Sequence, residues 1–241
     1  MSDKERYPAG FGDNLPSVTT ILGAFPGPQL LAWYKRMAFA EQKVISEKSL
    51  DIGKTLHELR IRIEKGEPLE IVTKYPEEMQ NCIKAYLKWK KEREIPPIVY
   101  SELRMYSKDL GYRGTCDDIA GNRLKLILLE HKTSSGIYDD ALEQVVAYKK
   151  LFESPDTQFL DLVGNSKSRK ISSAWVTRFP KDKPDFETRM VRPEEEWELF
   201  ESFSMKLRIF QIRKKREAQW RLEHADDTRP YNAKPSSGEG S

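Results

Sequence analysis

Apolar residues recur three or four positions apart through the first third of the chain, the spacing of one face of an α-helix. Ser17 stands at the start of the first such segment, where its hydroxyl can accept a hydrogen bond from the helix backbone as an N-cap. Gly- and Pro-containing stretches separate several of the segments. The pattern predicts four helices, from Ser17 to the break at 23–28, and over about 30–48, 51–66 and 76–94.

The pattern changes at Pro96-Pro97, where alternating and continuous apolar runs replace the helical spacing. Leu126–Leu129 form an unbroken apolar run, which is typical of a central strand buried on both faces. A long charged segment opens at Pro193. These segments predict strands over 98–107, 112–120 and 125–132, a helix over about 138–152, strands over 171–179 and 186–191, and a helix over about 193–223.

The order of elements is helices first, then a mainly antiparallel sheet interrupted by a helix, which predicts an α/β fold. We expect a mixed central β-sheet flanked by helices, with an N-terminal helical layer and a long C-terminal helix. The expected divisions are a flexible arm (1–15), a helical cap or arch (16–95), the core (96–225) and a disordered Pro/Ser/Gly-rich tail (226–241).

Composition narrows the class of protein. A chain of 241 residues can bury a core, and its 33% of charged residues predicts a heavily charged surface. No apolar run approaches the roughly 18 residues of a membrane span, and the N-terminus does not resemble a secretory signal. We therefore expect a cytoplasmic protein without a membrane partner. The net charge of +3 is too small to indicate nucleic acid by itself.

Two charged residues interrupt the end of the apolar run assigned to a buried strand. Glu130 and Lys132 are two positions apart, so their side chains share one face of the strand while His131 points to the other. Charges at a buried strand end are costly unless they are paired or bind an ion. Taken alone, the pair also fits the solvated end of an ordinary strand.

The preceding strand offers a carboxylate at a matching place. Asp117 lies late in that strand, before Gly121-Asn122. A hairpin loop centred between residues 123 and 124 puts Asp117 directly opposite Glu130. A tight turn at Gly121-Asn122 instead leaves the two carboxylates on one face but about 13 Å apart along the strands. A catalytic pair therefore predicts the longer loop.

Two carboxylates across a hairpin form a seat for a hard divalent cation. Lys132 would then hold a water near a scissile phosphate and offset the developing charge. These are the parts that phosphodiester hydrolysis requires. Asp118 faces the other side of its strand, and we expect it to be a polar residue beside the turn.

Four short motifs follow one another between residues 53 and 148. They are Gly53-Lys54-Thr55-Leu56-His57-Glu58, Gly114-Thr115-Cys116-Asp117, Glu130-His131-Lys132 and Gln144-Val145-Val146-Ala147-Tyr148. In order and spacing they resemble the motifs of the PD-(D/E)XK nuclease superfamily, and the first and last are similar to those of its RecB-like branch. The opening Ser17-Val18-Thr19 is similar to the start of members that include the mitochondrial genome-maintenance exonuclease and related phage and viral exonucleases.

The resemblance implies a restriction-endonuclease-like core and a role for each matched residue. The implied catalytic residues are Asp117, Glu130 and Lys132. The implied metal ligands are His57, Asp117, Glu130 and the backbone carbonyl of His131. Gln144 and Tyr148, one helical turn apart, would support the lysine and the DNA strand. The implied cofactor is Mg²⁺ or Mn²⁺, and an imidazole beside carboxylates favours Mn²⁺.

Other positions have two interpretations each. Glu102 is either an acid that supports the site or an exposed strand residue. Trp33, Lys35 and Arg36 combine an aromatic ring with cations, as in proteins that bind single-stranded DNA, although Trp33 also fits the interior of the helical layer. The basic run at 213–216 is either a solvated helix face or a phosphate-binding surface.

The sequence thus predicts a metal-dependent exonuclease that acts on single-stranded DNA or frayed ends. Two alternatives use the same residues: a flap or junction endonuclease, and a catalytically silent DNA-binding scaffold for a replication or recombination protein. Cys82 and Cys116 are too few for an iron–sulfur cluster, and the chain has no Walker loop. We therefore expect neither an iron–sulfur cluster nor a nucleotide cofactor.

Overall fold

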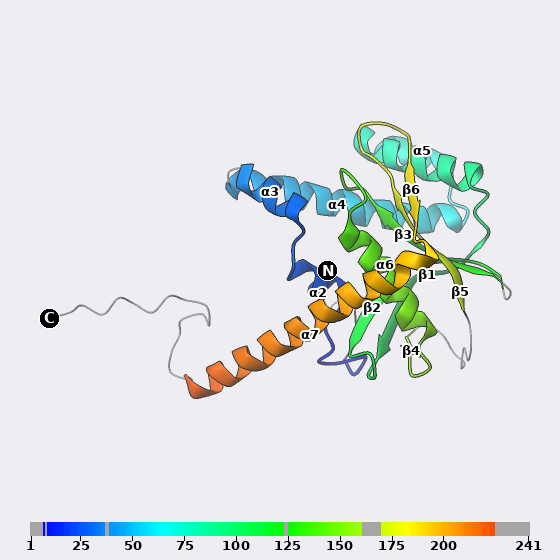
Figure 1. Ribbon diagram of the computed structural model, residues 1–241. Coiled ribbons are helices and arrows are strands. Elements are labelled where there is room, and N and C mark those ends of the chain that lie inside the picture. Colours follow the sequence, from blue (N-terminus) through cyan, green and yellow to red (C-terminus); the bar gives the residue numbers. More distant parts are fainter. Residues whose placement is uncertain (1–6, 8, 37–38, 123–124, 161–169, 225–241) are drawn as a thin grey trace.

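The computed structural model describes residues 7, 9–36, 39–122, 125–160 and 170–224, and only the backbone of residues 33 and 39–44. In this part of the chain, helices flank a six-stranded mixed sheet, and a long helix follows the last strand (Figure 1). The helices are α2 (Val18–Gly23), α3 (Pro28–Arg36), α4 (Phe39–Glu64), the 3₁₀ helix η1 (Leu69–Lys74), α5 (Glu77–Glu92), α6 (Asp139–Glu153) and α7 (Pro193–Glu223). The strands are β1 (Ile98–Ser107), β2 (Tyr112–Gly121), β3 (Leu126–Lys132), β4 (Gln158–Phe159), β5 (Ile171–Arg178) and β6 (Glu187–Met190). The predicted α/β class and long C-terminal helix are confirmed.

The strands lie in the order β4-β1-β2-β3-β5-β6. Neighbouring strands are antiparallel except β3 and β5, which are parallel. A parallel pair needs a crossover connection, and α6 lies within it (Figure 1). The prediction of a mainly antiparallel sheet interrupted by a helix is therefore confirmed. β4 was not predicted, because two residues are too few to show a periodic pattern.

β3 is buried on both faces, as its continuous apolar run predicted. Leu126 and Leu128 pack in one hydrophobic core with residues of α2, α6 and α7. Ile127 and Leu129 pack in a second core with residues of α4 and α5. This alternation follows from the two-residue repeat of a strand. The two cores fix α4 and α6 on opposite sides of β3.

α4 differs from the prediction of separate helices over 30–48 and 51–66. It runs without a break from Phe39 to Glu64, through residues 48–51. That stretch contains neither Pro nor Gly, and packing of a helix face outweighs a local change in pattern. Upstream, α3 ends at Arg36 and α4 begins at Phe39. Residues 37 and 38 lie outside the described part of the chain.

The expectation of a flexible arm is wrong for residues 7 and 9–15. The side chains of Tyr7 and Phe11 are buried. Tyr7 Oη lies 3.0 Å from Thr115 Oγ1, and the Phe11 ring meets Tyr106 edge-on at a centroid distance of 4.8 Å. Two aromatic side chains bury enough apolar surface to hold a Gly- and Pro-rich segment against the sheet. The predicted tail, 226–241, lies outside the described residues.

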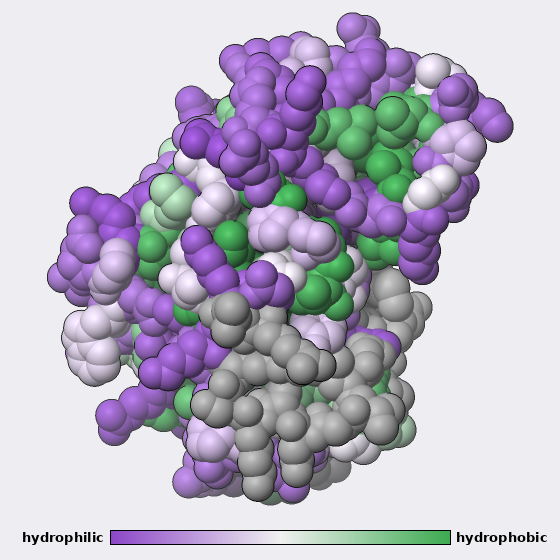
Figure 2. Space-filling model, turned by 90° about the vertical axis from the view of Figure 1, so that its right-hand side faces the viewer, coloured by the Kyte–Doolittle hydropathy of each residue, from purple (hydrophilic) through white to green (hydrophobic). Residues whose placement is uncertain are grey.

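The surface carries the charge that the composition predicted. Figure 2 shows a largely hydrophilic face with separate apolar patches. Among the described residues, every helix is too short or too polar to cross a membrane.

Candidate active site

The hairpin of β2 and β3 has the longer of the two predicted loops. Gly121 pairs with Leu126, and the register continues without a shift to the pair of Asp118 and Leu129. One further step places Asp117 opposite Glu130. The expected juxtaposition of the two carboxylates is confirmed, and the alternative that separates them along the strands is excluded.

The residues of β3 alternate between the two faces as predicted. The His131 ring packs among Tyr86, Trp89 and Phe179, with centroid distances of 5.9, 5.4 and 5.5 Å. Glu130 and Lys132 point instead toward α6, where they contact Gln144. His131 is therefore a core side chain on the face opposite Glu130 and Lys132, where the strand repeat predicted it.

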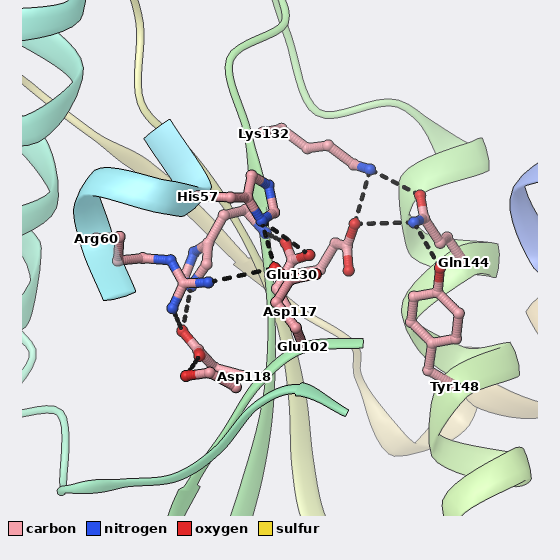
Figure 3. Close-up of polar contacts among 11 residues, drawn as sticks. His57, Arg60, Glu102, Asp117, Asp118, Glu130, Lys132, Gln144 and Tyr148 are labelled. Atoms are coloured by element: carbon pink, nitrogen blue, oxygen red, sulfur yellow. Dashed lines mark hydrogen bonds and ion pairs between the residues drawn. The ribbon is translucent and has the colours of Figure 1, made fainter. Parts of the chain in front are cut away.

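Three potential metal ligands meet beside this strand pair: His57 from α4, Glu102 from β1 and Asp117 from β2 (Figure 3). His57 Nδ1 lies 2.7 Å from Glu102 Oε1 and 3.5 Å from Asp117 Oδ1. The His131 backbone amide donates a 2.7 Å hydrogen bond to Asp117 Oδ2, which fixes that carboxylate. The predicted role of the His131 carbonyl stays a prediction.

Glu102 belongs to this cluster, although its sequence context equally fitted an exposed strand residue. Its φ of +52° lies in the left-handed region that non-glycine residues rarely adopt. The pairs on either side, Ser101 with Asp118 and Leu103 with Cys116, keep the same register. The unusual backbone is therefore confined to the residue whose carboxylate meets His57. No periodic pattern signals a single left-handed residue inside a strand.

Glu130 belongs to a second group, which lies toward α6 (Figure 3). Lys132 Nζ donates to Glu130 Oε1 at 2.8 Å and to Gln144 Oε1 at 2.7 Å. Gln144 Nε2 in turn donates to Glu130 Oε1 at 2.8 Å and to Tyr148 Oη at 3.1 Å. The predicted neighbourhood of Gln144 and Tyr148 on one helical face, at the sheet, is confirmed. This network fixes the direction of the Lys132 ammonium.

Gly114, from the second motif, makes room for this group. A Cβ atom at residue 114 would lie 2.5 Å from Cε1 of the Tyr148 ring, closer than carbon atoms approach without displacement. Tyr148 is nearly fully buried, so its ring has little space into which it could move. The glycine in this motif therefore follows from the close approach of α6 to β2.

The electrostatics of the site reflect crowded carboxylates offset by cations. Burial and the Asp117 carboxylate raise the pKa of Glu130, against the opposing effect of Lys132. Burial alone would lower the pKa of His57, but Asp117 and the hydrogen bond to Glu102 outweigh it and raise the pKa to about 9. Burial would likewise lower the pKa of Lys132, but the attraction of Glu130 and Asp117 raises it. Added positive charge would stabilise this arrangement.

The residues present fit a divalent cation. One ligand atom from each of His57, Glu102 and Asp117 lies within 4.8 Å of the others. Imidazole and carboxylate groups suit Mn²⁺, and carboxylates suit Mg²⁺. Oε2 of Glu130 is buried and has no hydrogen-bond partner within the described ranges, which is costly for a carboxylate oxygen. The ligand cluster differs from the predicted one in containing Glu102, while Glu130 Oε1 is occupied by Lys132 and Gln144.

A buried ion pair lies directly behind the site. Arg60, on α4, is fully buried and bonds to Asp118, which is also fully buried. Asp118 further accepts a 2.6 Å hydrogen bond from Ser101 Oγ and lies 3.0 Å from His131 Nε2. Burial alone would raise the pKa of Asp118, but His131 and Arg60 lower it to about 2. The expectation that Asp118 is a polar residue beside the turn is wrong, because it joins three strands to α4.

Three members of this buried network are chain neighbours of site residues. Ser101 precedes Glu102, Asp118 follows Asp117, and His131 lies between Glu130 and Lys132. Arg60 lies three residues after His57, and its Nη2 is 3.7 Å from Glu102 Oε1. We did not single out Arg60 from the sequence. Its position three residues after a ligand histidine was the only available signal, and such spacing is common on helices.

Other predicted nucleic-acid contacts lie apart from these networks. Lys35 and Arg36 are exposed on α3, and Arg36 Nε donates to the backbone of Ala32 at 3.2 Å. The side chain of Trp33 lies outside the described part of the structure. The basic run at 213–216 is exposed on α7. Their predicted roles stay predictions.

Comparison with protein-family models gives no match to this chain. No curated protein matches it either. The function is therefore inferred from the site.

Proposed function

We propose that this protein is a divalent-metal-dependent DNA exonuclease of the PD-(D/E)XK type, similar to the RecB-like branch, acting on single-stranded DNA or frayed ends. The convergence of four separate motifs carries the proposal. They come from α4, β2, β3 and α6, and they meet at one end of the sheet with Asp117 opposite Glu130. A restriction-endonuclease-like core accounts for this arrangement, whereas chance motifs have no reason to share a site.

The chain supplies distinct groups for metal binding and for the phosphate. His57, Glu102 and Asp117 would hold the cation, and Glu130 would face it through the oxygen Oε2. When bound, a divalent cation polarises a phosphate oxygen and lowers the pKa of a coordinated water.

Lys132 provides the second positive charge. Its side chain is 25% exposed, against 4% for Glu130, so the ammonium is within reach of a substrate. Glu130 and Gln144 hold the ammonium in place, which lets it orient the attacking water and stabilise charge on the phosphate without reorganising. Tyr148 bonds to Gln144 and keeps the amide in the orientation that accepts from Lys132.

The decisive experiment measures cleavage of single-stranded DNA labelled at either end, with Mn²⁺, Mg²⁺ or EDTA, and with a covalently closed circle alongside. We expect metal-dependent loss of the linear strand only. Lys132→Ala should reduce the rate by at least about 100-fold, because it removes charge stabilisation in the transition state. Lys125→Ala, which removes an exposed lysine just before the same strand, should cleave like the wild type.

Three outcomes would change this conclusion. Cleavage of the circle at the rate of the linear strand would indicate a flap or junction endonuclease with the same site. DNA binding without cleavage under any metal would indicate a silent scaffold. Equal activity of Lys132→Ala and the wild type would rule out the proposed site.

A further inference from the structure

Helix α7 is anchored to the body of the protein by one face. Phe203 and Leu207 are buried in the core beside α6. Lys206 Nζ donates to Glu143 Oε1 of α6 at 2.7 Å, and Ser202 Oγ donates to the same atom at 2.8 Å. After Leu207 no residue of α7 is buried, and Figure 1 shows this half of the helix extending past the sheet.

The opposite face of α7 carries large apolar side chains in the open. Trp197, Met205 and Ile212 are 67%, 57% and 50% exposed. Successive residues of a helix are rotated by about 100° about its axis, so Trp197, Met205 and Ile212 fall within an arc of about 80°. This arc lies on the side of the helix away from Phe203 and Leu207. A solvated helix face usually carries polar residues, so three large exposed apolar side chains on one side of a helix indicate an interaction surface.

Charged residues lie on the same side of α7, and together with Trp197, Met205 and Ile212 they form a surface that we call the outer stripe. Glu194 and Glu201 lie in the same arc in the N-terminal part of the helix, and Arg208 and Lys215 lie in it in the C-terminal part. All four are exposed. The stripe is therefore acidic at one end and basic at the other, with Trp197, Met205 and Ile212 interspersed.

We propose that the outer stripe of α7 binds the same stripe of a second copy of this chain, with the two helices antiparallel. A two-fold axis between Ser204 and Met205 brings the two Met205 side chains together. It also places Trp197 beside Ile212 of the partner subunit, Glu201 beside the partner's Arg208, and Glu194 beside the partner's Lys215. Every contact except the one between the two Met205 side chains then occurs twice, as in an isologous dimer. The overlap from residue 194 to residue 215 spans about 33 Å.

Charge complementarity distinguishes a second copy from nucleic acid as the occupant. A DNA strand along the stripe would meet Glu194 and Glu201, which repel phosphates. In the antiparallel register each of these acidic residues meets a basic residue, and each apolar residue meets an apolar one. The distribution of charge along the outer stripe of α7 thus favours self-association, independently of the nuclease function.

The test is the molar mass of the full chain by sedimentation equilibrium between about 1 µM and about 100 µM. We expect a monomer–dimer equilibrium. Met205→Glu should weaken the dimer by at least about 100-fold, because it sets two like charges face to face at the axis. Met190→Glu is the matched control, since Met190 is 54% exposed on β6, outside the stripe, and its substitution should leave the dimer unchanged.

A charge exchange then tests the register. Glu201→Arg and Arg208→Glu should each weaken the dimer by about tenfold or more, and the double exchange should restore it, because opposite charges face each other again. A wild type that stays monomeric overturns the proposal, as does a dimer that Met205→Glu leaves intact. A monomer whose DNA affinity falls on Arg208→Glu would assign the surface to nucleic acid and overturns the dimer as well.

Discussion

At the scale of the residue, the candidate site depends on Glu102 holding an unfavourable backbone conformation. A left-handed glutamate costs about 1–3 kcal/mol and persists where the surrounding structure fixes it, which is common at functional sites. Regular pairing of Ser101 and Leu103 with β2 supplies that constraint. This backbone conformation brings the Glu102 carboxylate to His57. Its cost in stability is explained if the carboxylate is a metal ligand.

Glu102→Gln should separate metal binding from folding. The amide keeps the shape of the side chain but is a much weaker ligand, so the affinity for Mn²⁺ measured by titration calorimetry should fall by at least about 10-fold. The free energy of unfolding without metal should stay within about 1 kcal/mol of the wild type. Glu94→Gln is the control, because Glu94 also has a positive φ, 47°, at the end of α5. An unchanged Mn²⁺ affinity would remove Glu102 from the site.

At the scale of the element, α4 joins the sheet through an ion pair that sits one turn from the ligand His57. The side chains of Arg60 and Asp118 are both fully buried, and Asp118 also bonds to residues of β1 and β3. The network thereby sets the distance between the helix that carries His57 and the strands that carry the carboxylates. Arg60 is thus a positioning residue.

Arg60→Met should destabilise the fold by about 3–5 kcal/mol, because it leaves Asp118 buried without its cation. The double variant Arg60→Met/Asp118→Leu should be more stable than the single one, because no unpaired charge remains. If the pair positions the ligands, the folded double variant should still bind Mn²⁺ about 10–100-fold more weakly than the wild type.

The control is Arg62→Met on the same helix, which removes a half-exposed pair with Glu67. Denaturant unfolding gives the free energy of unfolding of each variant, and titration calorimetry gives its Mn²⁺ affinity. Normal Mn²⁺ affinity in the double variant would reduce the pair to a purely structural role.

Most helices and strands were predictable from the sequence, because the hydrophobic patterns and turn residues that indicate them lie within the segment itself. The two-residue repeat of β3 predicted the opposite faces of Glu130 and His131, and loop length fixed the register of Asp117. The unbroken α4, the buried Tyr7 and the Arg60–Asp118 pair depend on contacts with distant segments, which a pattern along one chain does not contain.

At the scale of the whole molecule, the site joins two layers of the fold. His57 comes from a helix on one side of the sheet and Gln144 from a helix on the other, with three strands between them. A ligand held by these elements together therefore stabilises the folded chain as a unit.

Excess Mn²⁺ should accordingly raise the melting temperature. At 100 times the dissociation constant, binding contributes about 2.7 kcal/mol. For a domain of this size that corresponds to roughly 5–10 °C in a calorimetric scan. His57→Ala should lose most of this increase, and EDTA should reverse it in the wild type. An increase of the same size in His57→Ala would place the ion elsewhere.

The parallel pairing of β3 with β5 also orders the events of folding. β1, β2 and β3 are joined by short turns, so their pairing closes small loops and can form early. β5 pairs with β3 only after the chain has passed through α6 and returned, which closes a much longer loop. We therefore expect the strands that carry the carboxylates of the site to pair early in folding, while Gln144 joins them during the slower step that docks α6 and adds β5.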